Sequence, residues 1–371
     1  MSETELRDIL ALARPELLDM PGYEPIEPVD VVAERLGIPE DQVVKLDGNE
    51  SPYGVSPRVR EALAGFPYYH IYPDPEQRRI REAIGRYVDV DPEQIVAGSG
   101  SDEILDLVAR LFLAPGVAVV DAAPTFGMYQ FLVRIYGARL VDVPRRENFD
   151  LDLPAMETAL AQGARLAFLA SPNNPTANLL PPEELERLLK HQAVVFVDEA
   201  YAEFAGESFV QWVARHDNLI VGRTFSKWAG LAGLRAGYGV FPKPIAEAVR
   251  KIKMPYNLNA AAEVAALAAL QDSGWLQEQV QAIRSERERL TGKLSDLPWL
   301  RPFPSCANFV LCEVRTLSAK DVRDRLREQG ILVRYFDVPG VRNCLRISVG
   351  KPEHSDRLMA ALRQIGGAVG K

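Results

Sequence analysis

Four short apolar runs in the middle of the chain constrain its fold more than any other feature. They occupy residues 117–120, 166–169, 194–197 and 219–221, and each is bounded by polar or turn residues. Each run has about the length of a buried strand, and helical patterns alternate with the runs. Near-continuous apolar strands that alternate with helices are typical of a mainly parallel sheet covered by helices on both faces. The sequence therefore predicts an α/β fold.

A helix is predicted to follow the glycine-rich turn at residues 98–101. Ser99 is expected to cap this helix and Asp102 to complete a capping box. The first backbone N–H groups of a helix have no partner inside it, so this turn is a candidate anion site. Apolar residues recur at helical spacing after it, at Ile104, Leu105, Val108, Leu111 and Phe112.

The two ends of the chain depart from this central pattern. A proline-rich stretch from Pro15 to Pro28 cannot form one helix, because each proline removes a donor and clashes with the preceding turn. We expect it to lie over the surface of another part of the protein. Towards the other end the pattern predicts a long polar helix (275–294), a strand (308–314), a helix that Ser318 opens and Gly330 closes, two strands (331–334 and 345–349) and a last helix.

These patterns predict three parts. Residues 1–45 form an N-terminal segment that packs on the small domain or on a partner, residues 46–273 form a large domain, and residues 274–371 form a smaller α/β domain. A chain of 371 residues has the length of two domains.

Composition and charge exclude several functions. The formal net charge of −8 disfavours non-specific binding to nucleic acid or to anionic membranes, since both need clustered Lys and Arg. No apolar run approaches the ~20 residues of a membrane span, and the acidic start lacks the features of a secretion signal. Three cysteines form no disulfide framework, so we expect a cytoplasmic protein. The four histidines show no metal-binding spacing, and no metal site is predicted.

Polar side chains follow three of the apolar runs, where the strands should end. The carboxyl ends of parallel strands meet at one edge of a sheet, and we expect these side chains to lie close together. They are Asn174 after the second run, Asp198 and Tyr201 after the third, and Thr224, Ser226, Lys227 and Arg235 after the fourth.

This set of groups fits pyridoxal 5′-phosphate. The helix start at Ser101 and Asp102, together with hydroxyls and Arg235, can hold a phosphate. A lysine beside an arginine should have a lowered pKa, so that Lys227 can react as a free amine and form a Schiff base. A carboxylate at the end of a core strand needs a cation, and Asp198 would keep the pyridine nitrogen protonated.

Three further side chains complete the predicted cofactor site. Tyr201 and Asn174 would donate hydrogen bonds to the 3-oxygen of the ring. Phe126 could stack on the ring face.

Four motifs in separate segments resemble the fold-type I, pyridoxal-phosphate-dependent aminotransferases. They occupy residues 173–176, 197–201, 226–235 and 344–350. Within that group the chain is most similar to the histidinol-phosphate aminotransferases, on residues 46–54, 72–75 and 98–103. The motifs run from about Tyr23 to Gly350. The resemblance implies a large domain with a mainly parallel sheet between helices and a smaller C-terminal domain.

The resemblance also implies roles for individual residues around the cofactor. Lys227 moves a proton between the substrate α-carbon and the cofactor. Arg235, Thr224, Ser226 and the backbone of Ser101 and Asp102 hold the phosphate. Tyr72 reaches the cofactor of a neighbouring subunit, which implies a homodimer.

On the substrate side, Arg346 matches the arginine that binds the α-carboxylate of glutamate. In the other half-reaction Arg346 and Arg334 would hold the phosphate of the substrate. Tyr23 and Asn49 match positions that line the substrate side.

Three departures from the family pattern bear on the site. Ala177 replaces a glycine, which the fold should tolerate only if the backbone there avoids positive φ. Phe126 replaces a tyrosine, so stacking is kept and a phenol hydrogen bond is lost. The resemblance assigns no role to residues 335–337.

The implied function is transamination between histidinol phosphate and 2-oxoglutarate, giving imidazole acetol phosphate and L-glutamate in L-histidine biosynthesis. Three alternatives stay open: an aromatic aminotransferase, a threonine-phosphate decarboxylase, and a transcription regulator with an aminotransferase-like module. A regulator of that kind carries an added DNA-binding domain, and no spare basic helix-turn-helix segment is visible here.

Overall fold

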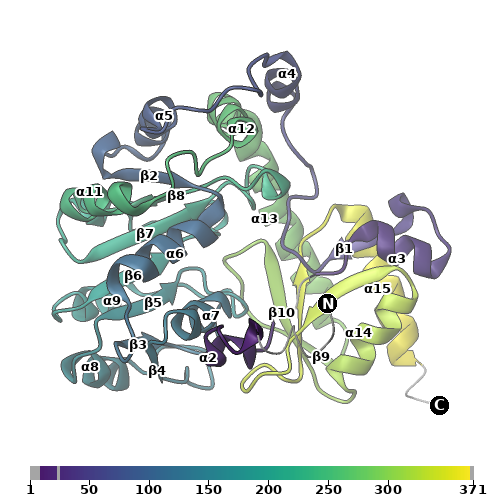
Figure 1. Cartoon of the computed structure of the whole chain (residues 1–371). Coiled ribbons are helices and arrows are strands. Elements are labelled where there is room, and N and C mark those ends of the chain that lie inside the picture. Colours follow the sequence, from purple (N-terminus) through teal and green to yellow (C-terminus); the bar gives the residue numbers. More distant parts are fainter. Residues whose placement is uncertain (1–8, 23–25, 368–371) are drawn as a thin grey trace.

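The computed structural model describes residues 9–22 and 26–367 and contains two β-sheets (Figure 1). The order in the larger sheet is β2-β8-β7-β6-β5-β3-β4. Strands β4, β3, β5, β6 and β7 run parallel, and β8 is antiparallel to both of its neighbours. Their bounds are β2 (Ile95–Gly98), β3 (Ala118–Asp121), β4 (Arg139–Asp142), β5 (Leu166–Ala170), β6 (Val194–Asp198), β7 (Leu219–Thr224) and β8 (Gly237–Val240). The four predicted strands and the α/β fold are confirmed.

Helices cover both faces of this sheet because its strands are apolar on both sides. Phe196 and Ile220 pack in one buried cluster, while Val195 and Val221, one residue away along the same strands, pack in the other. The first cluster includes residues of α6 (Gly100–Phe112), α7 (Met128–Ile135) and α11 (Lys243–Ile252). The second includes residues of α4 (Pro57–Gly65), α5 (Arg78–Val88), α8 (Leu153–Ala161), α9 (Pro182–Leu188), α10 (Ala202–Ala205) and α12 (Ala260–Gln271).

The smaller sheet combines the C-terminal part with one strand from near the N-terminus. Its order is β1-β11-β12-β10-β9, with bounds β1 (Val44–Leu46), β9 (Leu300–Pro302), β10 (Phe309–Val314), β11 (Ile331–Tyr335) and β12 (Cys344–Ser348). The helices of this part and of the N-terminal segment are α2 (Pro15–Leu18), α3 (Val29–Leu36), α14 (Ala319–Glu328) and α15 (Pro352–Gly367). Ser318 caps α14 as predicted, because its side chain accepts the N–H of Asp321.

One long helix, α13 (Ser273–Ser295), belongs to the cores of both sheets. Leu276 and Ile283 pack in the larger core, whereas Leu290 and Leu294 pack in the smaller one. The predicted domain boundaries at 45/46 and 273/274 stay predictions. None of the helices in residues 9–22 and 26–367 combines the length and apolar character that a membrane crossing requires.

The predicted capping box at the start of α6 was wrong. The side chain of Ser99 makes no capping hydrogen bond, and its backbone N–H instead donates to Glu103 Oε2 at 2.5 Å. Asp102 pairs with Arg235 at 2.8 Å. The first turn of α6 is therefore left without a side-chain cap, and its N–H groups can serve an acceptor from outside the helix.

Candidate active site

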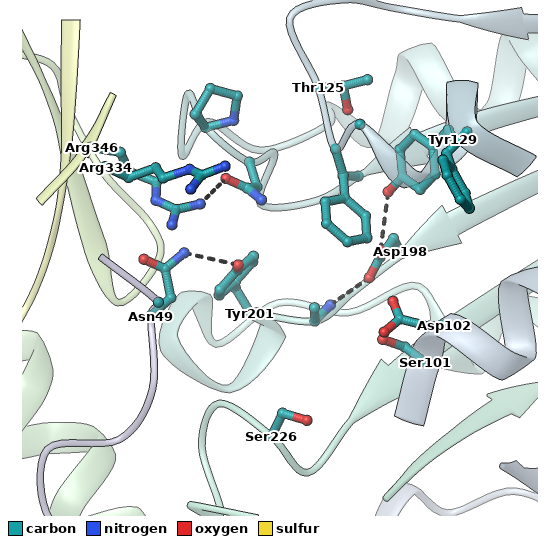
Figure 2. Close-up of a pocket in the computed structure, with 18 of the residues that line it drawn as sticks. Asn49, Ser101, Asp102, Thr125, Tyr129, Asp198, Tyr201, Ser226, Arg334 and Arg346 are labelled. Carbon is teal, nitrogen blue, oxygen red and sulfur yellow. Dashed lines mark hydrogen bonds between the residues drawn. The ribbon is translucent and has the colours of Figure 1, made fainter. Parts of the chain in front are cut away.

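A cavity of about 600 Å³ lies where the carboxyl ends of β6 and β7 meet β11 and β12 of the smaller sheet. The sequence-predicted residues that line it are Asn49, Ser101, Asp102, Phe126, Asn174, Asp198, Tyr201, Thr224, Ser226, Lys227, Arg235, Arg334 and Arg346. Figure 2 shows the two arginines Arg334 and Arg346 on one side of the cavity and Asp198, Asp102 and Ser101 on the opposite side. The N-terminal segment contributes Pro21 and Ile26 to the lining, as its predicted surface position allows.

One end of the cavity is built to hold an anion. Ser101 and Asp102 open α6 there, Arg235 lies beside them, and the hydroxyls of Thr224 and Ser226 are 2.9 Å apart. Arg235 adopts a left-handed φ of 57°, a strained conformation that is common at functional sites.

Glycines let these pieces approach one another. A Cβ on Gly100, whose φ is +80°, would lie 2.4 Å from Nη2 of Arg235. A Cβ on Gly237 would lie 2.5 Å from the backbone of Gly100 and Ser101. Side chains at either position would push the helix start and the arginine apart, so the glycines create the cradle. Its donors fit the phosphate of pyridoxal 5′-phosphate.

The amine of Lys227 lies in the cavity and donates to the backbone oxygen of Gly48 at 3.0 Å. Burial lowers the pKa of Lys227 to about 8, and the nearby carboxylate of Glu50 opposes this shift. Arg346 lowers the pKa further. The predicted direction is confirmed, but burial is the main cause and the contributing arginine is Arg346. The amine is thus available as a nucleophile close to neutral pH.

The carboxylate of Asp198 lies at the end of β6 and is 5% exposed. Its Oδ1 accepts the N–H of Ala200 and its Oδ2 accepts the hydroxyl of Tyr129, each at 3.0 Å. Burial raises the pKa of Asp198 to about 6, and these two hydrogen bonds oppose that shift. At neutral pH Asp198 is thus a buried carboxylate anion, which fits a cationic partner such as a protonated pyridine nitrogen.

Hydrogen bonds connect the two sheets across the cavity. Asn49, with a left-handed φ of 55°, donates from Nδ2 to the hydroxyl of Tyr201 at 3.0 Å, and its backbone N–H donates to Ser348 Oγ at 2.9 Å. Arg346 donates to Asn174 Oδ1 at 2.7 Å. These contacts hold Tyr201 and Asn174 in place between the cradle and the arginines.

Arg334 and Arg346 face the cavity from adjacent strands and share an aromatic neighbour. The guanidinium carbons lie 5.5 and 5.4 Å from the ring centroid of Phe336, which is also part of the lining. Residue 336, in the stretch to which the resemblance assigned no role, thus contacts both arginines and lines the cavity.

One expectation about the departures from the family pattern was wrong. Ala177 has a φ of 62° and is fully buried, so the expectation that this backbone avoids positive φ was wrong. Hydrogen bonds of its N–H to Asn173 O at 2.7 Å and of its oxygen to the N–H of Cys306 at 2.9 Å hold it there. Tyr72 does not line this cavity of its own chain; it is 76% exposed and stacks on Tyr256. Its predicted reach into a neighbouring subunit stays a prediction. Tyr23 lies outside the described residues.

Three residues that line the cavity were not predicted as site residues: Tyr129, Glu50 and Phe336. Tyr129 stands at the start of α7, and its partner Asp198 is 69 residues away, so no local pattern pointed to it. Glu50 lies next to Asn49 inside a motif, but nothing in the sequence places it near Lys227.

The family model for aminotransferases of class I and II matches residues 41–362. The chain belongs to this aminotransferase family. A histidinol-phosphate aminotransferase of Roseiflexus castenholzii is 48% identical over 366 residues, covering 96% of this chain and 99% of that one. A chloroplastic histidinol-phosphate aminotransferase of Nicotiana plumbaginifolia is 45% identical over 356 residues, covering 95% and 86%.

Solved structures agree with this assignment. The histidinol-phosphate aminotransferase of Sinorhizobium meliloti, solved in complex with pyridoxal 5′-phosphate, has a TM-score of 0.88 and 29% identity, and covers 97% of this chain and 98% of that one. The predicted resemblance to this group of aminotransferases is confirmed, and the protein is an enzyme.

Proposed function

We propose that this aminotransferase transfers the amino group of histidinol phosphate to 2-oxoglutarate with pyridoxal 5′-phosphate as cofactor, in L-histidine biosynthesis. The observation that carries this proposal is the pair Arg334 and Arg346, which face one cavity together with Lys227 and Asp198. Both substrates are anions, and two guanidinium groups suit a phosphate or a carboxylate. The names of the relatives at 45–48% identity support the same substrate.

Pyridoxal 5′-phosphate, when bound, supplies an electron sink for the charge that develops at the substrate α-carbon. Lys227 Nζ would take the proton from that carbon and deliver it to the C4′ carbon of the cofactor. Asp198 keeps the pyridine nitrogen protonated through its carboxylate. Thr224, Ser226 and Arg235, with the start of α6, hold the phosphate.

The remaining site residues orient the two bound molecules. Tyr201 and Asn174 hold the 3-oxygen of the ring, and Phe126 covers one ring face. Arg346 binds the α-carboxylate of glutamate in one half-reaction, and Arg346 and Arg334 bind the substrate phosphate in the other. Asn49 places the hydroxyl of Tyr201 through their 3.0 Å hydrogen bond.

The active form is a homodimer in which Tyr72 reaches the cofactor phosphate of the partner subunit. Support comes from an exposed apolar surface around it, since such patches mark interfaces. Tyr72 stacks on Tyr256 with centroids 4.4 Å apart, and Ile71 and Met254 are more than half exposed nearby in the chain. Sedimentation should give a mass of two 41.2 kDa chains, and Tyr72→Ser should weaken cofactor binding. A monomer with full activity would contradict this part.

We place the enzyme in the cytoplasm, as its three free cysteines suggest.

A panel of amino donors with 2-oxoglutarate tests the substrate. Histidinol phosphate should give the highest kcat/KM, with L-glutamate as product. A higher value with phenylalanine would favour an aromatic aminotransferase, and release of CO₂ from threonine phosphate would favour a decarboxylase.

A further inference from the structure

Tyr129 contacts Asp198 at the wall of the cavity, at a position to which no motif assigned a function. Its side chain is fully buried, and its hydroxyl donates to Asp198 Oδ2 at 3.0 Å (Figure 2). The N–H of Ala200 donates to the other carboxylate oxygen. Because each oxygen has its own donor, the rotation of the carboxylate is fixed.

The tyrosine ring is itself held from two sides. It stacks on Phe168 of β5, with centroids 5.0 Å apart and planes 9° from parallel. It meets Phe126 edge-on, with centroids 5.7 Å apart and planes at 89°. The hydroxyl therefore has a fixed position relative both to the sheet and to the aromatic ring assigned to cover the cofactor.

The charges around Asp198 create the need for such a donor. Burial raises its pKa, and the carboxylates of Asp102 on α6 and Glu199 beside it on the chain raise it further. The hydroxyl of Tyr129 on α7 is the strongest opposing influence. Burial and Asp198 together raise the pKa of Tyr129 well above its ordinary value, so its hydroxyl stays protonated and remains a donor at neutral pH.

We propose that Tyr129 is a positioning residue that keeps Asp198 ionised and directed at the pyridine nitrogen of the cofactor. This inference rests on the proposed function in one respect, the identity of the cofactor. It adds a residue that acts through Asp198 without touching the substrate.

Titration of the cofactor-free protein with pyridoxal 5′-phosphate, followed by visible absorbance, tests the role. Tyr129→Phe removes one oxygen and keeps the ring, and it should weaken binding about tenfold, the typical loss of one hydrogen bond to a charged group. In an Asp198→Asn background the same change should weaken binding less than about twofold, because the two residues act as a unit. Tyr136→Phe is the matched control, since Tyr136 ends the same helix and donates to Asp106 at 2.8 Å outside the cavity.

The pH dependence of the same titration gives a second readout. Without the hydroxyl the pKa of Asp198 rises. Cofactor binding by Tyr129→Phe should therefore begin to weaken at a higher pH than in the wild type as the pH is lowered. Equal binding by Tyr129→Phe and wild type, or an equal loss in both Asp198 backgrounds, would overturn the inference and leave Tyr129 a packing residue. Histidinol phosphate is absent from these titrations, so an error in the proposed substrate would leave their result unchanged.

Discussion

Arg334 and Arg346 lie directly opposite each other on the antiparallel strands β11 and β12, and both line the cavity. Like charges that face each other across a sheet are destabilising. Phe336 offsets part of this cost, because both guanidinium groups lie near its ring. A bound phosphate or carboxylate would offset the rest, so the arrangement suits a site that binds anions in both half-reactions.

Arg346→Lys should lower kcat/KM for glutamate about 10- to 100-fold, as expected for the loss of hydrogen bonds to a charged group. Lysine keeps the charge but lacks the planar fork that reaches Asn174 and the backbone oxygen of Asp47. Steady-state kinetics measure the effect. Arg342→Lys is the control, because Arg342 pairs with Asp337 on the surface. Equal kinetics for the two variants would contradict the assignment of Arg346.

Phe336→Leu should raise the KM for histidinol phosphate about three- to tenfold, because it removes the ring shared by the two guanidinium groups. The visible band of bound pyridoxal 5′-phosphate should not change, since Phe336 lies beside Arg334 and Arg346, on the side of the cavity formed by the smaller sheet. Kinetics and absorption spectra of the same preparation separate the two effects. A changed spectrum with an unchanged KM would show that the ring serves the cofactor instead.

The lowered pKa of Lys227 predicts two pH dependences. The rate at which cofactor-free protein takes up pyridoxal 5′-phosphate should rise towards pH 8 and level off above it, because the neutral amine is the reactive form. The stability of the cofactor-free protein should rise between about pH 8 and 10.5, since the unfolded lysine holds its proton in that window and the folded one does not.

Stopped-flow absorbance measures the uptake, and urea unfolding measures the stability. Lys227→Met should lack the rise in stability that the lysine causes. An uptake rate that keeps rising to a midpoint near 10.5 would contradict the shift.

Sequence patterns predicted the strands that are apolar on both faces, because those strands lie in the interior of the larger sheet. They did not predict β8, whose glycines at 237 and 239 are required by close contacts with residues of α6, more than 130 positions earlier in the chain. They also missed β4, whose residues are exposed or half-buried. Local patterns cannot report such contacts.

The same distinction between local patterns and distant contacts holds for the site residues. Residues in motifs, such as Lys227 and Asp198, were predicted and lie in one cavity. Tyr129 could not be predicted, because its partner Asp198 is 69 residues away and the contact depends on how α7 packs against β6. The positive φ of Ala177 likewise comes from hydrogen bonds with residues in the folded loop.

Ala177→Gly should leave the free energy of unfolding within about 0.5 kcal/mol of wild type. The lost methyl group costs about 0.8 kcal/mol and the greater freedom of glycine in the unfolded chain about 0.5–1 kcal/mol, while relief of the left-handed φ returns about 1–2 kcal/mol. Ala167→Gly is the control: Ala167 is equally buried but lies in the strand β5, and its loss should cost about 1–2 kcal/mol. Urea unfolding at one protein concentration compares the two. Equal losses in both variants would show that Ala177 is not strained.

The central claim is that Lys227 is the amine that binds pyridoxal 5′-phosphate in this cavity. Reduction of the protein with borohydride after incubation with the cofactor makes the link permanent, and peptide mass spectrometry then locates it. We predict a single modified peptide carrying the adduct on Lys227, and no adduct in Lys227→Ala. An adduct on another residue, such as the neighbouring Lys45, or none in the wild type, would contradict the account.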